Sequence, residues 1–224
     1  MNDLSRRFHE RKSSGQPVAA LTAYDYPTAR LVDESGIDLI LVGDSLGMVV
    51  LGYPDTTQVT LDDMVRHTGA VARGTKKSPV ITDLPIGTYD TTDQAVATAQ
   101  RVIAAGANGV KLEGGEAVLP QIRALTAAGT PVLAHLGMLP QHIREEGGYK
   151  IKGRTAEEAE TLRRDARAVQ EAGAFAVVLE IIIPELAAEI SASLDIPTIG
   201  IGSGGGCGGQ ILVLHDLVGL YPWF

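Results

Sequence analysis

The 224-residue sequence is poor in cysteine and in positive charge, and both shortages limit what the protein can be. Cys207 is its one cysteine, so no disulfide can form within the chain, as is usual in the reducing cytoplasm. The 19 Lys and Arg residues face 27 Asp and Glu residues, which gives a net charge of −8 without a basic stripe. Such a chain is a poor candidate for binding nucleic acid.

Signals for export and for membrane insertion are also missing. The N-terminal segment 1–16 is charged and has no apolar centre, so it does not resemble a signal peptide. The longest apolar runs, 37–42 and 177–184, are far shorter than the roughly 18 residues of a membrane span. We therefore expect a cytoplasmic protein with no membrane partner.

The composition is that of one folded domain. Hydrophobic residues make up 45% of the chain, and its 26 glycines and 11 prolines are scattered instead of forming a linker. We predict a single domain over residues 1–224.

Eight short apolar runs, rich in Val, Ile and Leu, recur along the chain. Polar residues do not alternate with the apolar ones, which is typical of parallel strands buried on both faces. The predicted strands are Val18–Thr22, Leu39–Val42, Val80–Thr82, Gly109–Leu112, Val132–His135, Ala176–Leu179, Thr198–Ile201 and Ile211–Leu214.

Helical patterns separate these strands. The predicted helices include Leu61–Arg73 with Thr60 as its cap, Thr92–Ala105, Thr155–Ala172 and Pro184–Leu194. Strands that alternate with helices or long loops predict an α/β fold, a (β/α)8 TIM barrel. The alternative is an open doubly wound sheet, which usually has a phosphate loop near its first strand, and residues 22–26 do not resemble one. Only HDLVGLYPWF follows the last strand, so we expect the C-terminal helix to be shortened or missing.

A weak internal repeat supports the barrel. The segments ESGIDLILVGD (34–44), AAGANGVKLEG (104–114) and EAGAFAVVLEI (171–181) share one plan. In each, a helix is expected to end at a glycine, a strand follows, and a carboxylate stands at the far end of that strand. The three carboxylates are those of Asp44, Glu113 and Glu180.

Polar residues gather where the predicted strands end, which is the active-site face of a parallel barrel. Besides the three carboxylates of the repeat, they are Tyr24, Asp25, Ser45, Asp83, Lys111 and His135. Carboxylates that lie so close together repel one another, unless a divalent cation lies among them. Oxygen ligands favour magnesium. Asp44, Asp83 and Glu113 are therefore the best candidate metal ligands, and neither an HExxH motif nor a second cysteine suggests zinc.

Each of these residues also has an ordinary structural explanation. Asp44 and Asp83 could cap the helices that follow their strands. Lys111 could point outwards and pair with a helix, and His135 could be a hydrogen-bonded core histidine. Glu180 is harder to explain in this way, because a buried carboxylate without a partner is costly, and a general base is the function that suits it.

The glycine-rich segment GIGSGGGCGGQ (200–210) contains G-x-G-x-x-G, but a single match is a weak signal. A flexible loop near the barrel mouth is the favoured interpretation. A phosphate site after the seventh strand is the alternative.

Several motifs in order resemble one family, ketopantoate hydroxymethyltransferase. The resemblance runs from about residue 17 to 216, and the most specific motifs are GDSLGMVVLGY, KLEGG and GGYK-x-x-GR. Other matching segments are ITDLPIGTY (81–89), HLGMLPQ (135–141), VVLE (177–180) and IGIGSG (199–204). The family is similar to the phosphoenolpyruvate-mutase and isocitrate-lyase barrels.

The resemblance implies a hydroxymethyl transfer in pantothenate biosynthesis. The co-substrate 5,10-methylenetetrahydrofolate donates the one-carbon unit to 3-methyl-2-oxobutanoate, giving 2-dehydropantoate through a magnesium-stabilised enolate. It implies one Mg²⁺ per subunit, with Asp44, Asp83 and Glu113 as metal-site carboxylates and Glu180 as the proton acceptor. Ser45 and Lys111 match positions that hold the carboxylate of the keto acid, and His135 matches a histidine near the new hydroxyl. Asp44 and Asp83 thereby also contact the substrate.

The resemblance further implies a homo-oligomer, typically a decamer. The chain departs from the family pattern at Gly208, where an Asp is usual, and it stops where the family continues beyond HD-x-x-G. Two other functions therefore stay open: another magnesium-dependent enzyme that makes or breaks C–C bonds in α-keto acids, and a truncated, non-catalytic barrel.

Overall fold

A computed structural model describes residues 3–221 of the chain. The predicted TIM barrel is confirmed, because the eight strands follow one another in the order of a closed barrel, β1-β2-β3-β4-β5-β6-β7-β8. The pairings of β1 with β2, β2 with β3, β5 with β6, β6 with β7 and β7 with β8 are parallel. The strands are β1 (Val18–Thr22), β2 (Leu39–Val42), β3 (Val80–Asp83), β4 (Gly109–Glu113), β5 (Val132–Gly137), β6 (Ala176–Glu180), β7 (Thr198–Ile201) and β8 (Gly209–Leu212).

Two helices, α4 and α8, begin at the threonine caps that the sequence indicates. Thr60 and Asp63 form a capping box at the start of α4, and the Thr155 side chain accepts a hydrogen bond from the Glu158 backbone at the start of α8. The α-helices are α1 (Asp3–Ser13), α2 (Tyr26–Glu34), α3 (Leu46–Val49), α4 (Leu61–Gly74), α5 (Thr92–Ala104), α6 (Leu119–Ala127), α7 (Ile143–Glu146), α8 (Ala156–Glu171), α9 (Pro184–Ser193) and α10 (Leu214–Leu217). Short 3₁₀ turns are η1 (Thr56–Gln58), η2 (Glu116–Val118) and η3 (Pro140–His142).

Seven predicted strands start at the predicted residue, and the eighth prediction was wrong by two residues. The strand β8 begins at Gly209, where no side chain fits against β1, since an added Cβ would lie 2.3 Å from the Val18 carbonyl oxygen. It ends before Leu214, whose backbone N–H donates to Thr22 Oγ1 at 2.9 Å and starts α10.

The contacts within the chain form two compact units. Unit 1 contains residues 3–18 and 111–210, and unit 2 contains residues 19–110 and 211–221. Within residues 3–221, no helix has both the length and the apolar character needed to cross a bilayer.

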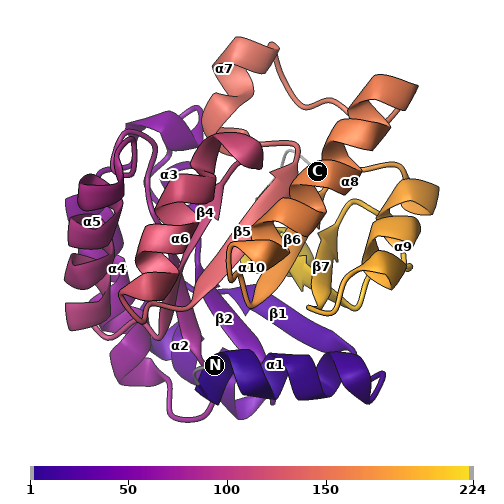
Figure 1. Ribbon diagram of the computed structural model, residues 1–224. Coiled ribbons are helices and arrows are strands. Elements are labelled where there is room, and N and C mark those ends of the chain that lie inside the picture. Colours follow the sequence, from indigo (N-terminus) through magenta and orange to yellow (C-terminus); the bar gives the residue numbers. More distant parts are fainter. Residues whose placement is uncertain (1–2, 222–224) are drawn as a thin grey trace. The chain divides into compact units, whose positions relative to one another are not determined.

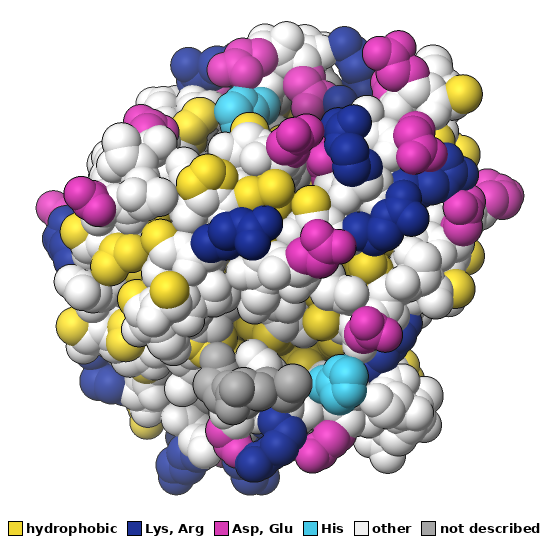
Figure 2. Space-filling model, viewed as in Figure 1, with side chains coloured by type: hydrophobic (Ala, Val, Ile, Leu, Met, Phe, Trp, Pro, Cys, Tyr) yellow, Lys and Arg dark blue, Asp and Glu magenta, His cyan; other side chains and the backbone are white. Residues whose placement is uncertain are grey.

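In unit 1, α8 packs on β5 and β6 and against α9 (Figure 1). The strands β5 and β6 are almost wholly buried, as their uninterrupted apolar runs predict. Phe8 of α1 is fully buried and meets the Phe175 ring edge to face, with 5.1 Å between the ring centroids. Figure 2 shows positive and negative side chains interspersed on the face in view. Arg163 of α8 and Glu189 of α9 form an ion pair.

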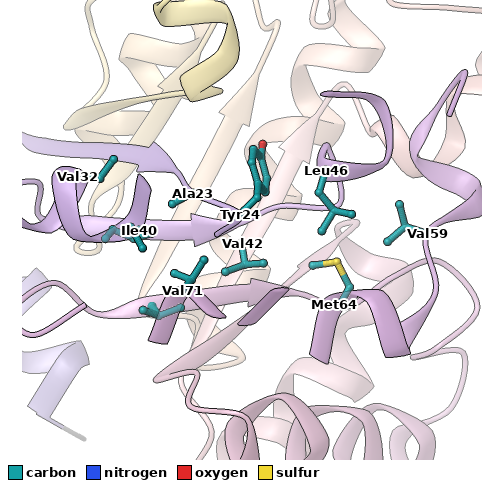
Figure 3. Packing of buried hydrophobic residues seen from close by; sticks show 11 residues of the cluster. Ala23, Tyr24, Val32, Ile40, Val42, Leu46, Val59, Met64 and Val71 are labelled. Carbon is teal, nitrogen blue, oxygen red and sulfur yellow. The ribbon is translucent and has the colours of Figure 1, made fainter. Parts of the chain in front are cut away.

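In unit 2, α4 packs on β2 and β3 and against α2 and α5. Figure 3 shows Val42 of β2, Leu46 of α3 and Met64 of α4 close together in the apolar cluster. The ring of Tyr24 belongs to the same cluster, while its hydroxyl extends away from the aliphatic side chains. The cluster therefore fixes the segments that follow β1 and β2.

A buried carboxylate holds the connection from α4 to β3. Asp33 of α2 is 3% exposed and accepts hydrogen bonds from the backbone N–H groups of Lys76, Lys77 and Ser78 at 3.0, 3.0 and 2.8 Å. Burial alone would raise the pKa of Asp33, but the three backbone donors outweigh it and lower this pKa below its ordinary value.

We expect Asp33→Ala to lower the free energy of unfolding by about 2–4 kcal/mol at pH 7, because charge-assisted hydrogen bonds are lost. The lowered pKa means that this contribution is complete above the ordinary Asp pKa of about 3.9 and disappears as the pH falls through the folded-state pKa. Urea unfolding of both proteins at several pH values measures the difference. The neighbouring Glu34→Ala is the control, with an effect below about 1 kcal/mol, because Glu34 is 62% exposed. A difference for Asp33→Ala that grows towards acid pH would contradict this account.

Candidate functional site

Four ionisable side chains of unit 1 meet where β4, β5 and β6 end. Glu113 Oε1 lies 3.8 Å from Lys111 Nζ and 3.5 Å from His135 Nδ1. On the other side of the imidazole, His135 Nε2 lies 3.2 Å from Glu180 Oε2. The structure thus brings together all four residues that the sequence predicts for this part of the chain, with His135 between two carboxylates.

These four groups are withdrawn from water to different degrees. Lys111, Glu113 and His135 are 4%, 1% and 2% exposed, while the Glu180 side chain is 14% exposed. Burying charge is unfavourable unless opposite charges and hydrogen bonds compensate, and each of these groups has a partner in the set. Because Glu180 is the most exposed, it is the member that a molecule arriving from solvent can meet first.

Backbone groups fix the cluster. The Gln141 backbone N–H donates to Glu113 Oε2 at 3.0 Å, and the Gly114 N–H donates to the His135 carbonyl at 3.0 Å. Gln141 is itself 2% exposed. Gln141 closes the HLGMLPQ motif that begins with His135, but no pattern in the sequence marks its contact with Glu113.

The residue after Glu180 has a strained backbone. Ile181 has a φ of +50°, a left-handed conformation that is unfavourable for a β-branched residue. Two backbone hydrogen bonds hold it: its N–H donates to the Ile201 carbonyl at 2.9 Å, and its carbonyl accepts from the Lys152 N–H at 2.8 Å. The strain lies next to Glu180 and helps to set the direction in which this side chain leaves β6.

Ser203 ties the same strand end to the glycine-rich segment. Its hydroxyl is buried, donates to the Leu179 carbonyl at 2.8 Å and accepts the Ile182 N–H at 3.0 Å. The glycines around it have a steric role, since an added Cβ on Gly206 would lie 2.6 Å from the Cβ of Ala188 in α9. No position in the GIGSGGGCGGQ pattern signals Ser203 by itself, because one serine among glycines is usual in a loop.

Unit 2 carries the other predicted site residues. Asp44 and Asp83 are 4% and 2% exposed, and Asp83 Oδ2 accepts the backbone N–H of Asp44 at 3.0 Å. Ser45 Oγ is 2.8 Å from the hydroxyl of Tyr24. Burial raises the pKa of Tyr24 above its ordinary value, and the nearby charges of Asp44 and Asp83 act in the same direction, so the phenol is neutral.

The helix-capping explanation of Asp83 is not borne out. The helix after β3, α5, is capped by Thr91, whose side chain accepts from the Gln94 backbone, and α3 has Ser45 at its cap position. Asp25, by contrast, is a cap: it accepts the Thr28 backbone N–H at the start of α2.

The donor set suits a hard divalent cation. Asp44 and Asp83 are both buried, and the Asp83 carboxylate contacts the backbone of Asp44. A cation that both carboxylates bind would offset their negative charges. Glu113 belongs to unit 1. Among residues 3–221, no three His, Cys, Asp or Glu side chains are grouped as metal ligands, so the magnesium site at Asp44, Asp83 and Glu113 stays a prediction.

Comparisons with known proteins agree with the resemblance found in the motifs. The family model "Ketopantoate hydroxymethyltransferase" matches residues 4–224. The 3-methyl-2-oxobutanoate hydroxymethyltransferase of Acetivibrio thermocellus is 53% identical over 100% of this chain and 81% of its own length. That of Hyperthermus butylicus is 55% identical over 94% of this chain and 74% of its own length.

Solved structures with low identity share the fold. Phosphoenolpyruvate phosphomutase from Streptomyces platensis has a TM-score of 0.72 at 17% identity, covering 96% of this chain and 82% of its own. Phosphonopyruvate hydrolase, solved with oxalate and Mg²⁺, has a TM-score of 0.73 at 17% identity, covering 97% and 82%. A 2,3-dimethylmalate lyase of the PEP mutase/isocitrate lyase superfamily has a TM-score of 0.69 at 20% identity, covering 98% and 84%.

We expect Ser203→Ala to lower the free energy of unfolding by about 1–3 kcal/mol, because the buried Ile182 N–H loses its acceptor. Denaturant unfolding measures this loss. Ser193→Ala is a matched control on the surface of α9, with an expected change within about 0.5 kcal/mol. Equal effects of the two substitutions would show that the Ser203 bridge does not support the end of β6.

Proposed function

Because the chain belongs to the ketopantoate hydroxymethyltransferase family, we propose that it transfers a hydroxymethyl group from 5,10-methylenetetrahydrofolate to 3-methyl-2-oxobutanoate in a magnesium-dependent reaction that yields 2-dehydropantoate. The observation that carries the chemistry is the contact of Glu180 with His135 at the end of β6, inside an otherwise buried set of charges.

Glu180 is the proposed general base. A carboxylate near the substrate can take the proton from C3 of the keto acid, and Glu180 Oε2 lies 3.2 Å from His135 Nε2. The strained backbone at Ile181 and the Ser203 bridge restrict the same strand end. A base that is held in place loses less entropy when the proton is transferred.

Asp44, Asp83 and Glu113 are the proposed ligands of one Mg²⁺ per subunit. The ion, when bound, would act as a Lewis acid that makes negative charge on the keto oxygen less unfavourable. Asp44 and Asp83 are buried in unit 2, where Asp83 Oδ2 accepts the backbone N–H of Asp44. The carboxylate of Glu113 accepts a hydrogen bond from the Gln141 backbone N–H, and this bond fixes the orientation of the carboxylate.

Lys111 and Ser45 are the proposed contacts of the keto acid carboxylate. Asp44 and Asp83 are also proposed to contact the substrate. The Lys111 ammonium is 4% exposed, and a charge in such a place attracts an anion more strongly than a charge in water does. The Ser45 hydroxyl is hydrogen-bonded to the neutral Tyr24 phenol. If Tyr24 is the donor of that bond, the Ser45 O–H can donate to the keto acid carboxylate. His135 lies beside the base and is the proposed contact of the new hydroxyl.

The atoms balance as follows. The C3–H bond of the keto acid breaks and its proton goes to Glu180. The methylene carbon exchanges its two bonds to folate nitrogens for a bond to C3 and a bond to the oxygen of water. The proton from C3 and one proton of water end on the two folate nitrogens, and tetrahydrofolate leaves. The cytoplasm as the location and a homo-oligomer as the working form are part of the same proposal.

We expect Glu180→Gln to lower the rate of 2-dehydropantoate formation by about 10²–10⁴-fold, because the amide cannot accept the proton. A coupled assay measures turnover, and ¹H NMR in D₂O measures exchange of the C3 proton in the presence of Mg²⁺ and without folate. Glu171→Gln at the exposed end of α8 is the control and should keep wild-type rates. Unchanged exchange in Glu180→Gln would remove Glu180 from the role of base. A folded wild-type protein without exchange or turnover would favour a non-catalytic barrel.

Removal of divalent metal should abolish both exchange and turnover, and Mg²⁺ should restore them. In Asp83→Asn, a higher Mg²⁺ concentration should be needed for half-maximal exchange, because one negative ligand is lost. Titration of the chelated protein with Mg²⁺ measures this. Full activity of the wild type in excess chelator would contradict the metal requirement.

A further inference from the structure

The short helix α10 is joined to the end of β1 by a hydrogen bond within unit 2. The backbone N–H of Leu214 donates to Thr22 Oγ1 at 2.9 Å. Thr22 is the last residue of β1 and is 2% exposed, so water does not compete for its hydroxyl. A backbone N–H can only donate, and Thr22 Oγ1 is therefore the acceptor in this bond, with its own hydrogen left to give.

The Tyr24 hydroxyl comes next in the series. It is hydrogen-bonded to the Thr22 side chain and lies 2.8 Å from Ser45 Oγ. Burial raises the pKa of Tyr24, so the phenol is neutral and has one hydrogen to donate. When Tyr24 accepts the hydrogen of Thr22, it gives its own to Ser45, and the Ser45 hydrogen is directed to a further acceptor.

The surroundings of Ser45 leave room for such an acceptor. Ser45 stands at the cap position of α3, but its side chain makes no capping hydrogen bond. An added Cβ on Gly43 would lie 2.8 Å from Ser45 Oγ and 3.5 Å from Asp83 Oδ2, so the glycine leaves space beside both groups. A carboxylate bound there can only accept. With a donor at one end and an acceptor at the other, every hydrogen in the series points the same way.

The ring of Tyr24 is held in place by packing. It belongs to the apolar cluster of unit 2, from which its hydroxyl extends (Figure 3). His215 of α10 packs against this ring, with 5.5 Å between the ring centroids and 46° between the ring planes. His215 Nδ1 is buried and has no hydrogen-bond partner among the described residues, so this edge of the imidazole contributes packing alone. The helix α10 thus supplies both the first donor of the series and a ring that restrains the phenol.

We propose that α10 directs the Ser45 hydroxyl towards the carboxylate of the keto acid, acting through Thr22 and Tyr24. Thr22, Tyr24 and His215 are then positioning residues, because none of them has to touch the substrate. A hydrogen bond to a charged acceptor is strong only when the donor points at it, so disorder in the series lowers the affinity for the keto acid. This inference rests on the proposed function, because it concerns how the same site holds its keto acid substrate.

Steady-state kinetics of 2-dehydropantoate formation, with the keto acid varied, test the series of hydroxyls. Tyr24→Phe keeps the ring and removes the hydroxyl, so it should raise the KM for the keto acid about tenfold and change kcat less than about threefold. Thr22→Val, which keeps the shape of the side chain, should raise this KM about threefold. Tyr26→Phe is the matched control at an exposed tyrosine and should keep the wild-type KM. Unchanged KM in both Tyr24→Phe and Thr22→Val would overturn the proposal.

A double-mutant cycle separates the direction of Ser45 from a general effect on the fold. In Ser45→Ala there is no hydroxyl to direct, so the addition of Tyr24→Phe should change the KM for the keto acid by less than about twofold. If Tyr24→Phe raised this KM by the same factor in both backgrounds, Tyr24 would act independently of Ser45 and the proposal would fail.

Two substitutions test the ring of His215. His215→Ala should raise the KM for the keto acid about three- to tenfold, because the phenol loses the ring that restrains it. His215→Phe supplies a ring again and should restore this KM to within about twofold of the wild type. Equal increases in the two variants would contradict the packing role. Wild-type turnover with unchanged KM in all variants would refute this inference alone, whereas a folded wild type without turnover would refute the proposed function and this inference with it.

Discussion

The feature on which the rest depends is the burial of charge at the ends of the strands. Lys111, Glu113 and His135 are almost wholly removed from water, and such a set is stable only when each group is held at hydrogen-bonding or ion-pair distance from a partner. The apolar strands around them supply the rigidity that this requires. Burial also strengthens the effect of each charge on a bound molecule, since the surrounding dielectric constant is low. Burial of charge thus lowers the stability of the barrel but strengthens the chemistry of the site. The partners at the strand ends offset the loss of stability.

The orientation of Glu180 illustrates how this is done. A carboxylate at the last residue of a strand would ordinarily be free to turn, because the chain leaves the sheet there. Here the next residue, Ile181, is in a left-handed conformation, and Ser203 bridges the carbonyl before Glu180 and the amide after Ile181. Backbone strain is tolerated when surrounding hydrogen bonds over-determine it. The glycines beside Ser203 permit the close packing on α9 that brings its hydroxyl to this position.

Much of this could be predicted from the sequence, for identifiable reasons. Uninterrupted apolar runs located seven strand starts correctly, and the carboxylates of the internal repeat pointed to the strand ends that the structure brings together in unit 1. The start of β8 was missed because Gly209 is selected by the proximity of Val18, which is distant in sequence. The role of Asp33 could not be predicted for a similar reason, because its three backbone donors lie more than forty residues further along the chain. An Asp near the end of an amphipathic helix is usually a surface residue.

Asp33 and Asp165 show why burial alone does not identify a functional carboxylate. Both lie on helices, and burial pushes the pKa of each upwards. Three backbone N–H groups reverse the shift for Asp33, so its hydrogen-bonding capacity is used within the protein and its role is structural. For Asp165, burial outweighs Arg164 and the Glu116 backbone N–H, so its pKa stays raised. The direction of a pKa shift therefore reports how far hydrogen bonds and neighbouring charges offset burial at each carboxylate.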